Sequence, residues 1–131
     1  MLFHKFSSQA ERRAFGGSDF FELQFCRMPP DTEAALLTAV DSVHHWRDDS
    51  LYISGDDDGA FMGAYGELFP WGMYNNLETG PIDPYGINYY RAELIDPFIA
   101  KLREVKPVEY EILAGWLTTA KGYNGFYLLG V

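Results

Sequence analysis

The chain has 131 residues, a length at which one domain with a single hydrophobic core is expected. Hydrophobic residues make up 47% of the composition and charged residues 22%, which argues against a disordered chain. The net charge of −9 makes nucleic acid and anionic membrane surfaces poor partners, because binding to phosphates needs concentrated positive charge.

The sequence indicates neither a covalent cross-link nor a membrane segment. Its single cysteine, Cys26, cannot form an intramolecular disulfide and argues against a cysteine-based zinc site. No apolar run approaches the roughly 20 residues that a membrane-spanning helix needs. The N-terminal residues also lack the features of a signal peptide. We therefore expect a soluble, cytoplasmic protein.

The first part of the chain predicts a short helix and a strand. Residues 8–15 can form one or two helical turns that end at the glycine pair 16–17. Residues 19–26 predict a half-buried strand, because apolar and polar side chains alternate along them. The apolar series is Phe21, Leu23 and Phe25, and the polar series is Glu22 and Gln24. We expect Cys26, at the end of this strand, to be a buried and unreactive thiol.

A longer helix is predicted over residues 31–46. Asp31 or Thr32 can cap it after a proline pair. Three side chains recur at the spacing of one helix face: Leu36, Val40 and Val43. Residues 50–54 then predict a strand, and residues 55–59 a charged turn.

The next segment is interrupted by glycine, proline and asparagine. Residues 60–69 favour another strand, whereas residues 75–88 are turn-forming throughout. Residues 89–105 predict a helix, or a short strand and then a helix. In the second version Asp96 is the cap and Pro97 the first helical residue.

The C-terminal part predicts a helix and a final strand. A helix is expected to open at Pro107 and to end near Gly122, and the apolar residues 125–131 predict a buried strand. The whole chain, 1–131, is therefore expected to be one α+β domain. It would have four or five strands in a mostly antiparallel sheet, two or three helices and a long central loop region.

The negative charge is concentrated in the middle of the chain. Residues 48–90 contain no Lys or Arg and contribute −8 of the net −9. The carboxylates of this stretch are Asp48, Asp49, Asp56, Asp57, Asp58, Glu67, Glu78 and Asp83. We expect them to form one outward-facing electronegative surface, which would steer a basic partner into encounter.

The same stretch is rich in aromatic residues, for which three roles are open: core packing, protein contact and ligand binding. Three of them favour the core, because a small domain must fill its interior: Phe61, Tyr65 and Phe69. Trp71 and Tyr85 lie among turn residues and could be contact anchors, since Trp and Tyr are enriched at binding hot spots. Aromatic rings beside carboxylates also suit sugar binding.

Residues 54–59 resemble part of a calcium-binding loop. With Gly59 at the sixth loop position, Asp56 and Asp58 fall at the third and fifth positions. The first and twelfth positions are then a serine and a tyrosine in place of carboxylates, so two key ligands are missing. We expect a charged turn here, and neither a metal ion nor a cofactor.

No pattern of residues predicts catalysis. The sequence has no Gly-x-Ser-x-Gly elbow and no phosphate-binding loop. Glu67 and Asp83 could be paired as in a glycosidase, but any acidic sequence offers such pairs. We therefore expect a protein that is not an enzyme.

The acidic stretch, with its aromatic residues, is suited to a basic protein surface. Together with the closing pattern it resembles the immunity proteins of bacterial polymorphic and contact-dependent toxin systems. The closing pattern is Pro107-Val108-Glu109-Tyr110, Gly115-Trp116-Leu117 and Asn124-Gly125-Phe126-Tyr127-Leu128-Leu129-Gly130. Such proteins are small, cytosolic and usually acidic, and each neutralises one toxin domain, frequently a nuclease.

The resemblance implies an inhibitor without enzymatic activity that binds a basic toxin domain. The carboxylates expected to supply the negative field are Asp56, Asp57, Asp58 and Glu67. The aromatic residues expected to be packed anchors are Trp71, Tyr74 and Tyr85. An acidic mimic of nucleic acid that acts against a nuclease would use the same physics.

The alternative is a small-ligand or carbohydrate-binding module that uses the same aromatic and carboxylate side chains. It predicts a concave pocket lined by Trp71, Tyr85 and Glu67. The affinity of such a pocket would depend little on salt, unlike the affinity for a basic protein.

Overall fold

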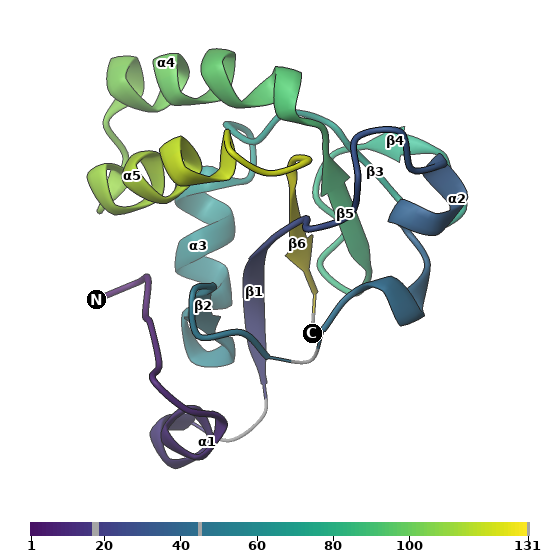
Figure 1. Cartoon of the computed structure of the whole chain (residues 1–131). Helices are drawn as coiled ribbons and strands as arrows, with labels where there is room; N and C mark the ends of the chain where they lie inside the picture. Colours follow the sequence, from purple (N-terminus) through teal and green to yellow (C-terminus); the bar gives the residue numbers. More distant parts are fainter. Residues whose placement is uncertain (17–18, 45, 131) are drawn as a thin grey trace.

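The computed structural model describes residues 1–16, 19–44 and 46–130. These residues form five α-helices and six strands, together with three short 3-10 turns (Figure 1). The helices are α1 Gln9–Gly16, α2 Ala34–Leu37, α3 Asp58–Tyr65, α4 Ile95–Val105 and α5 Tyr110–Ala120. The strands are β1 Phe20–Phe25, β2 Leu51–Ser54, β3 Gly72–Met73, β4 Thr79–Gly80, β5 Ile87–Tyr90 and β6 Phe126–Leu129.

All six strands belong to one antiparallel sheet in the order β2-β1-β6-β5-β3-β4. The predicted α+β class and antiparallel sheet are therefore confirmed. The counts differ from the prediction of four or five strands and two or three helices. The unpredicted strands are β3 and β4, which have only two residues each and are too short to show a period in the sequence. The unpredicted helix is α3, in a segment that was predicted to be a strand.

The strand register defines two ends of the sheet. Phe20 lies opposite Ser54 and Ile87 opposite Leu129, so β1 and β5 begin where β2 and β6 finish. We call this the Ser54 end. The opposite end, where Tyr90 pairs with Phe126, is the Tyr90 end.

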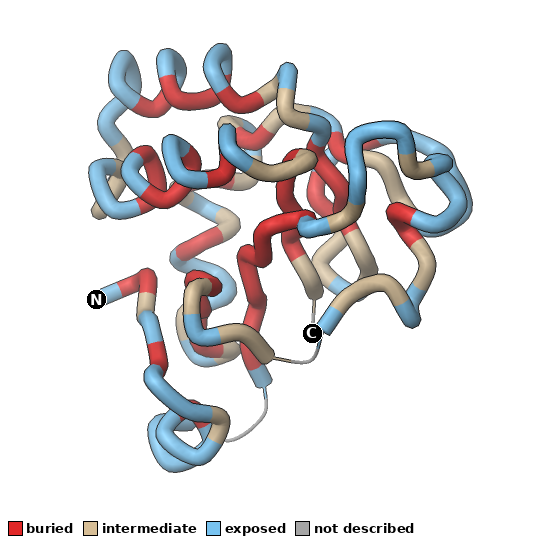
Figure 2. Tube along the Cα trace, viewed as in Figure 1, coloured by how far each residue is buried: buried red, intermediate tan, exposed pale blue. Residues whose placement is uncertain are grey.

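One face of the sheet is covered by α3, α4 and α5, which together with it enclose the main hydrophobic core. The side chains of Phe21, Leu23 and Phe25 point to this face. Phe25 stacks on Trp116 of α5 with ring centroids 4.3 Å apart. Figure 2 shows buried residues along β1 and exposed residues along the outward sides of α4 and α5.

The opposite face is also covered, by the N-terminal segment with α1 and by the chain between β1 and β2. The prediction of a half-buried β1 is therefore wrong, because Glu22 and Gln24 are only 5% and 1% exposed. An alternating pattern indicates two different faces, but it does not tell whether the polar face meets water or a second layer. We call this side the second face.

The predicted helix over residues 31–46 is wrong. The structure has a single turn, α2, followed by a 3-10 turn at Val40–Ser42. The hydroxyl of Thr38 donates to the carbonyl of Ala34 and is buried where the helix ends. Leu36 and Val40, expected on the buried face, are 53% and 66% exposed.

The strand predicted over residues 60–69 is also wrong, because this segment contains α3. Phe61 and Tyr65 are four positions apart and both fully buried, which is the spacing of a helix face. Glycines in the segment concealed this pattern. The turn expected at residues 55–59 is a 3-10 turn that leads into the first turn of α3.

The remaining predictions are largely confirmed. The short-strand version of residues 89–105 holds, although α4 begins at Ile95 and Asp96 lies inside its first turn. The helix expected from Pro107 begins at Tyr110. The expected ends of the first helix, at Gly17, and of the last strand, at Val131, lie outside the described residues. The central loop region is shorter than expected, because residues 48–90 also form β2, α3 and the three strands from β3 to β5.

No helix in the described part of the chain is long and apolar enough to cross a membrane.

Candidate functional site

The three consecutive aspartates lie at the Ser54 end of the sheet, where β2 passes into α3. Asp56 and Asp58 are exposed and Asp57 is half-buried. The backbone N–H of Gly55 donates to the carbonyl of Asp19 over 2.7 Å, which brings a fourth carboxylate beside them. Among the residues that the structure describes, no Lys or Arg forms an ion pair with these aspartates. Their negative charge therefore faces solvent uncompensated.

Glu67 and Trp71 lie at the Tyr90 end. Glu67 follows the C-terminal end of α3 and is exposed. Trp71 directly precedes Gly72, whose backbone approaches the ring of Tyr90, and its side chain is 66% exposed. It borders a groove of about 300 Å³ on the second face. The apolar side chains of this groove are Pro30, Leu37, Trp71, Met73, Tyr89 and Leu94.

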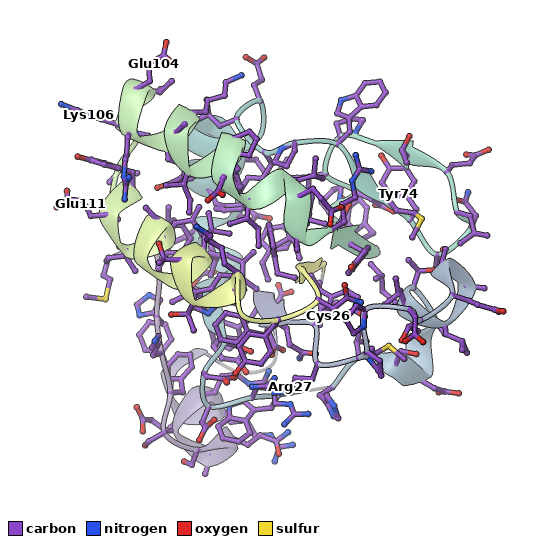
Figure 3. The ribbon with its side chains drawn as sticks, turned by 45° about the horizontal axis from the view of Figure 1, so that its top comes forward. Cys26, Arg27, Tyr74, Glu104, Lys106 and Glu111 are labelled. Atoms are coloured by element: carbon purple, nitrogen blue, oxygen red, sulfur yellow. The ribbon has the colours of Figure 1, made fainter. Side chains whose placement is uncertain are left out.

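Tyr74 lies in the β3–β4 hairpin and is half-buried. Its hydroxyl donates to the carbonyl of Pro81 over 2.5 Å, so it ties the hairpin to the segment after β4. Burial raises the pKa of its phenol, and the carboxylates of Asp83 and Glu78 add to the rise. Figure 3 shows Tyr74 beside the β3–β4 hairpin. Tyr74 therefore has a structural role within this edge of the sheet.

Tyr85 is 81% exposed on a loop that the fold holds in place. Its backbone N–H donates to the carboxylate of Asp83 over 3.0 Å. The buried side chain of Asn88 accepts from the N–H of Asp83 over 2.8 Å and donates to the carbonyls of Asp83 and Leu128. The exposed ring of Tyr85 is therefore carried by a loop whose backbone is fixed by these hydrogen bonds.

The seven predicted residues therefore do not form one surface. Asp56, Asp57, Asp58 and Tyr85 lie at the Ser54 end, whereas Glu67 and Trp71 lie at the Tyr90 end. The pocket expected for a ligand-binding module is not formed either: Trp71 and Tyr85 border different cavities, and Glu67 is in the lining of neither. The core assignment of Phe61, Tyr65 and Phe69 is confirmed.

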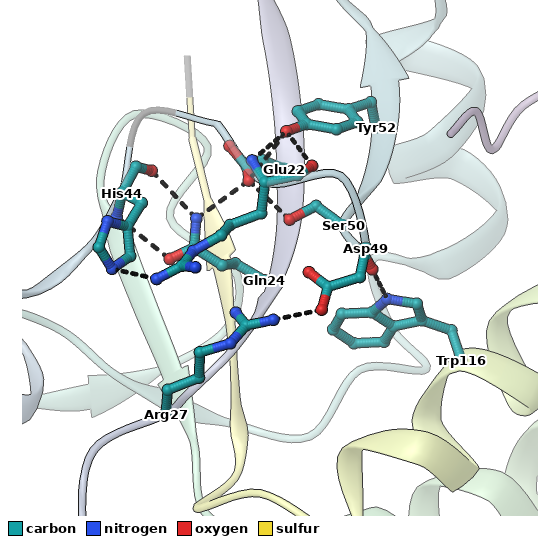
Figure 4. Close-up of polar contacts among 9 residues, drawn as sticks. Glu22, Gln24, Arg27, His44, Asp49, Ser50, Tyr52 and Trp116 are labelled. Atoms are coloured by element: carbon teal, nitrogen blue, oxygen red, sulfur yellow. Dashed lines mark hydrogen bonds and ion pairs between the residues drawn. The ribbon is translucent and has the colours of Figure 1, made fainter. Parts of the chain in front are cut away.

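The second face carries a polar cluster that the sequence analysis missed (Figure 4). The Oε2 atom of Glu22 accepts hydrogen bonds from Ser50 over 2.7 Å, Gln24 over 3.0 Å and Tyr52 over 3.1 Å. Burial raises the pKa of the Glu22 carboxyl, and the three hydrogen bonds and the nearby charge of Arg12 partly oppose that rise. The only signal in the sequence was the polar side of the β1 alternation.

Gln24 connects this cluster to the segment before β2. Its side chain accepts from the backbone N–H of His44 over 3.1 Å and donates to the His44 carbonyl over 3.0 Å. The Nε2 atom of His44 in turn lies 2.5 Å from the guanidinium of Arg47. Partial burial and the charges of Arg47 and Arg27 lower the pKa of the His44 ring. The imidazole is therefore favoured in its neutral form.

Two further observations concern the thiol and possible metal ligands among the described residues. Cys26 is a free, fully buried thiol, as expected, and lies 3.5 Å from the hydroxyl of Tyr127. Within the described ranges, no group of three or more His, Cys, Asp or Glu side chains could hold a metal ion. The described residues present to solvent the aspartates at the Ser54 end, which form no ion pair with a described Lys or Arg, and three exposed aromatic rings: Phe15, Trp71 and Tyr85. Comparison with protein-family models, with curated proteins and with solved structures finds no match for this chain.

Proposed function

We propose that the protein is an inhibitor of the immunity type, without enzymatic activity, that binds and neutralises a basic toxin domain in the bacterial cytosol. A nuclease is the expected class of toxin, because a surface that holds nucleic acid must be basic. The observation that carries the proposal is the Trp71 side chain, which is exposed beside a partly apolar groove in a strongly acidic chain.

The Trp71 groove has the features of a binding hot spot. A large aromatic side chain lies at its border, and Met73 and Tyr89 of the sheet form part of its floor. It lies next to β4, one of the two edge strands of the sheet. An apolar side chain of the partner would be buried there against a preformed surface, which limits the entropy lost on binding.

The charges around the groove support a basic partner. Glu67 is exposed four positions before Trp71, and Glu78 is exposed directly before β4. Glu93 and Arg91 both line the groove and pair with each other over 3.2 Å, so these two charges balance. The exposed carboxylates of Glu67 and Glu78 would attract positive charge and disfavour acidic competitors.

The remaining carboxylates act over a longer range. Asp49 is paired with Arg27, so one of the eight acidic residues of the middle stretch is neutralised. The aspartates at the Ser54 end have no such partner among the described residues. They would accelerate encounter with a basic protein without belonging to the contact surface.

The proposal is tested by affinity capture from a lysate of the source organism, with tagged wild-type chain and a tagged Trp71→Ala variant. We expect a basic protein that binds the wild type at low salt, elutes at high salt and binds the variant weakly. The captured protein, purified, must be toxic or nucleolytic, and equimolar wild-type chain must inhibit it. A captured protein whose activity the chain leaves unchanged, or whose binding is indifferent to salt, contradicts the proposal.

A further inference from the structure

The second face carries a larger cavity at the Ser54 end, which the proposed inhibitor function does not use. Its volume is about 650 Å³, within the range of about 300–1,000 Å³ that small-molecule sites occupy. It is lined by residues of helix α1, of the segment 40–44, of the segment 85–87 and of the end of β6. β1 contributes the floor through Phe20 and Glu22.

The negative charge at this floor is already compensated by the protein. Glu22 is 5% exposed, and three neighbouring side chains donate to one of its carboxylate oxygens. The guanidinium of Arg12 lies near enough to favour the charged carboxylate. A cationic ligand would therefore compete with donors that Glu22 already has.

Two arginines of α1 line the same cavity. The guanidinium carbon of Arg12 lies 5.5 Å from the ring centroid of Tyr52 and 5.7 Å from that of Phe20, so the aromatic rings hold it in place. Arg13 is exposed at the wall. With His44 favoured as a neutral ring, the described lining residues carry two positive charges and one negative charge. Their net charge is therefore positive, in a chain of net charge −9.

The rest of the lining suits the apolar or aromatic part of an organic ligand. Its apolar side chains are Val40, Val43, Ile87 and Leu129, and Tyr85 adds an exposed aromatic ring. The side chains of Gln9 and Asn75 supply amide groups that can donate hydrogen bonds. Apolar walls with a few convergent polar groups are typical of small-molecule sites.

We propose that this cavity binds a small organic anion: an apolar or aromatic body that carries a phosphate or carboxylate group. Arg12 and Arg13 hold the oxyanion, because guanidinium groups match the geometry of carboxylate and phosphate oxygens. The body packs against Val43, Ile87 and Leu129. The site is independent of the Trp71 groove, so the failure of one proposal leaves the other unaffected.

The test is an NMR titration of the full wild-type chain with three probes: phenyl phosphate, benzylamine and inorganic phosphate. Phenyl phosphate and benzylamine share an aromatic ring and differ in charge. We expect phenyl phosphate to shift the backbone amides of Val43, Ile87 and Gly130 in a saturable way and to bind more tightly than the other two probes. If benzylamine binds as tightly as phenyl phosphate or more tightly, the ligand is not an anion. If inorganic phosphate binds as tightly as phenyl phosphate, the aromatic ring contributes nothing and the ligand needs no organic part.

A pair of exposed arginines provides the matched variants. Arg13→Gln removes one cation of the cavity, and Arg103→Gln removes a comparable exposed cation from α4. We expect Arg13→Gln to weaken phenyl phosphate binding by about threefold or more, the range of an exposed ion pair, and Arg103→Gln to leave the affinity unchanged. Equal effects of the two variants, or the absence of saturable shifts at the cavity, overturn the proposal.

Discussion

The hydroxyl of Ser50 donates a hydrogen bond of 2.7 Å to the carboxylate of Glu22 between two layers of the fold, where both residues are buried. Tyr52, opposite Glu22 in the β1–β2 register, donates to the same oxygen. A carboxylate removed from water is costly unless donors replace the water. The second face is therefore a polar layer whose stability depends on the protonation of Glu22.

The first prediction concerns this dependence on pH. Burial raises the pKa of Glu22 in the folded chain above its usual 4.5, so the folded state holds the proton more tightly than the unfolded state. The resulting stabilisation is fully present below pH 4.5 and is lost as the pH rises through the folded pKa. Glu22→Gln, which imitates the protonated acid, should thus gain stability relative to the wild type as the pH rises.

The measurement is the free energy of unfolding in urea for both chains between pH 4 and pH 8. Glu104→Gln serves as the control, because Glu104 is exposed on α4 (Figure 3) and its change should add a nearly constant offset. If the difference in free energy of unfolding between the wild type and Glu22→Gln does not change with pH over this range, burial does not raise the pKa of Glu22.

The second prediction concerns the Trp71 groove. Trp71 is 66% exposed, so Trp71→Ala should change the free energy of unfolding by less than about 1 kcal/mol. If Trp71 is the anchor of the interface, the same change should weaken binding to the captured partner by about 2 kcal/mol. Most of this loss should be an increase in the dissociation rate, measured by surface plasmon resonance.

Val108→Ala is the matched control, since Val108 is 56% exposed and lies before α5, outside the Trp71 groove. It should leave the dissociation rate unchanged. Unfolding of Trp71→Ala would identify Trp71 as a packing residue, and equal dissociation rates for both variants would place the interface elsewhere.

The third prediction concerns steering by the aspartates of the Ser54 end. Replacing Asp56 and Asp58 with Lys changes the net charge by +4 in one region. The association rate should fall by roughly an order of magnitude at low salt and should lose part of its salt dependence. The dissociation rate should change less, because these residues act at a distance from the groove.

The control variant carries Glu104→Lys and Glu111→Lys, which make the same change in net charge on α4 and α5 (Figure 3). Stopped-flow mixing over a range of salt concentrations measures both rates. If the two double variants slow association equally, only the net charge matters and the position of the aspartates does not.

The sequence could predict the elements that have a clear period or punctuation. β1 and β6 have alternating or continuous apolar runs, and α5 follows a proline. The exposed aromatic residues Trp71 and Tyr85 could also be recognised from the turn residues around them. Their grouping could not, because it depends on the strand order, which places β3 and β4 beyond β5.

The polar cluster of the second face could not be predicted from the sequence, for a physical reason. Glu22 and Gln24 are polar, and a single sequence gives no sign that Ser50, Tyr52 and the backbone of His44 satisfy them. Each of these contacts joins residues at least 20 positions apart. A buried polar cluster of this kind is specified by tertiary structure and has no local pattern.

The last prediction concerns the glycine that opens β6. Gly125 has φ +82°, a conformation that L-amino acids with side chains rarely adopt, and a Cβ there would collide with the backbone carbonyl of Tyr90. Its own carbonyl accepts from the N–H of Cys26 over 3.0 Å, so the backbone cannot move away without breaking the sheet. Gly125→Ala should therefore destabilise the fold by about 2 kcal/mol or more, within the range for strained backbone and steric conflict.

Gly115 offers the opposite case in the same protein. It is exposed in α5, and a Cβ there would meet nothing within 4 Å. Gly115→Ala should stabilise the fold by about 0.5–1 kcal/mol, because alanine loses less conformational entropy than glycine in a helix. Chemical unfolding of both variants measures whether each substitution lowers or raises the free energy of unfolding. A loss of stability in Gly115→Ala, or an unchanged stability in Gly125→Ala, would contradict the local geometry of α5 or of the entry to β6, respectively.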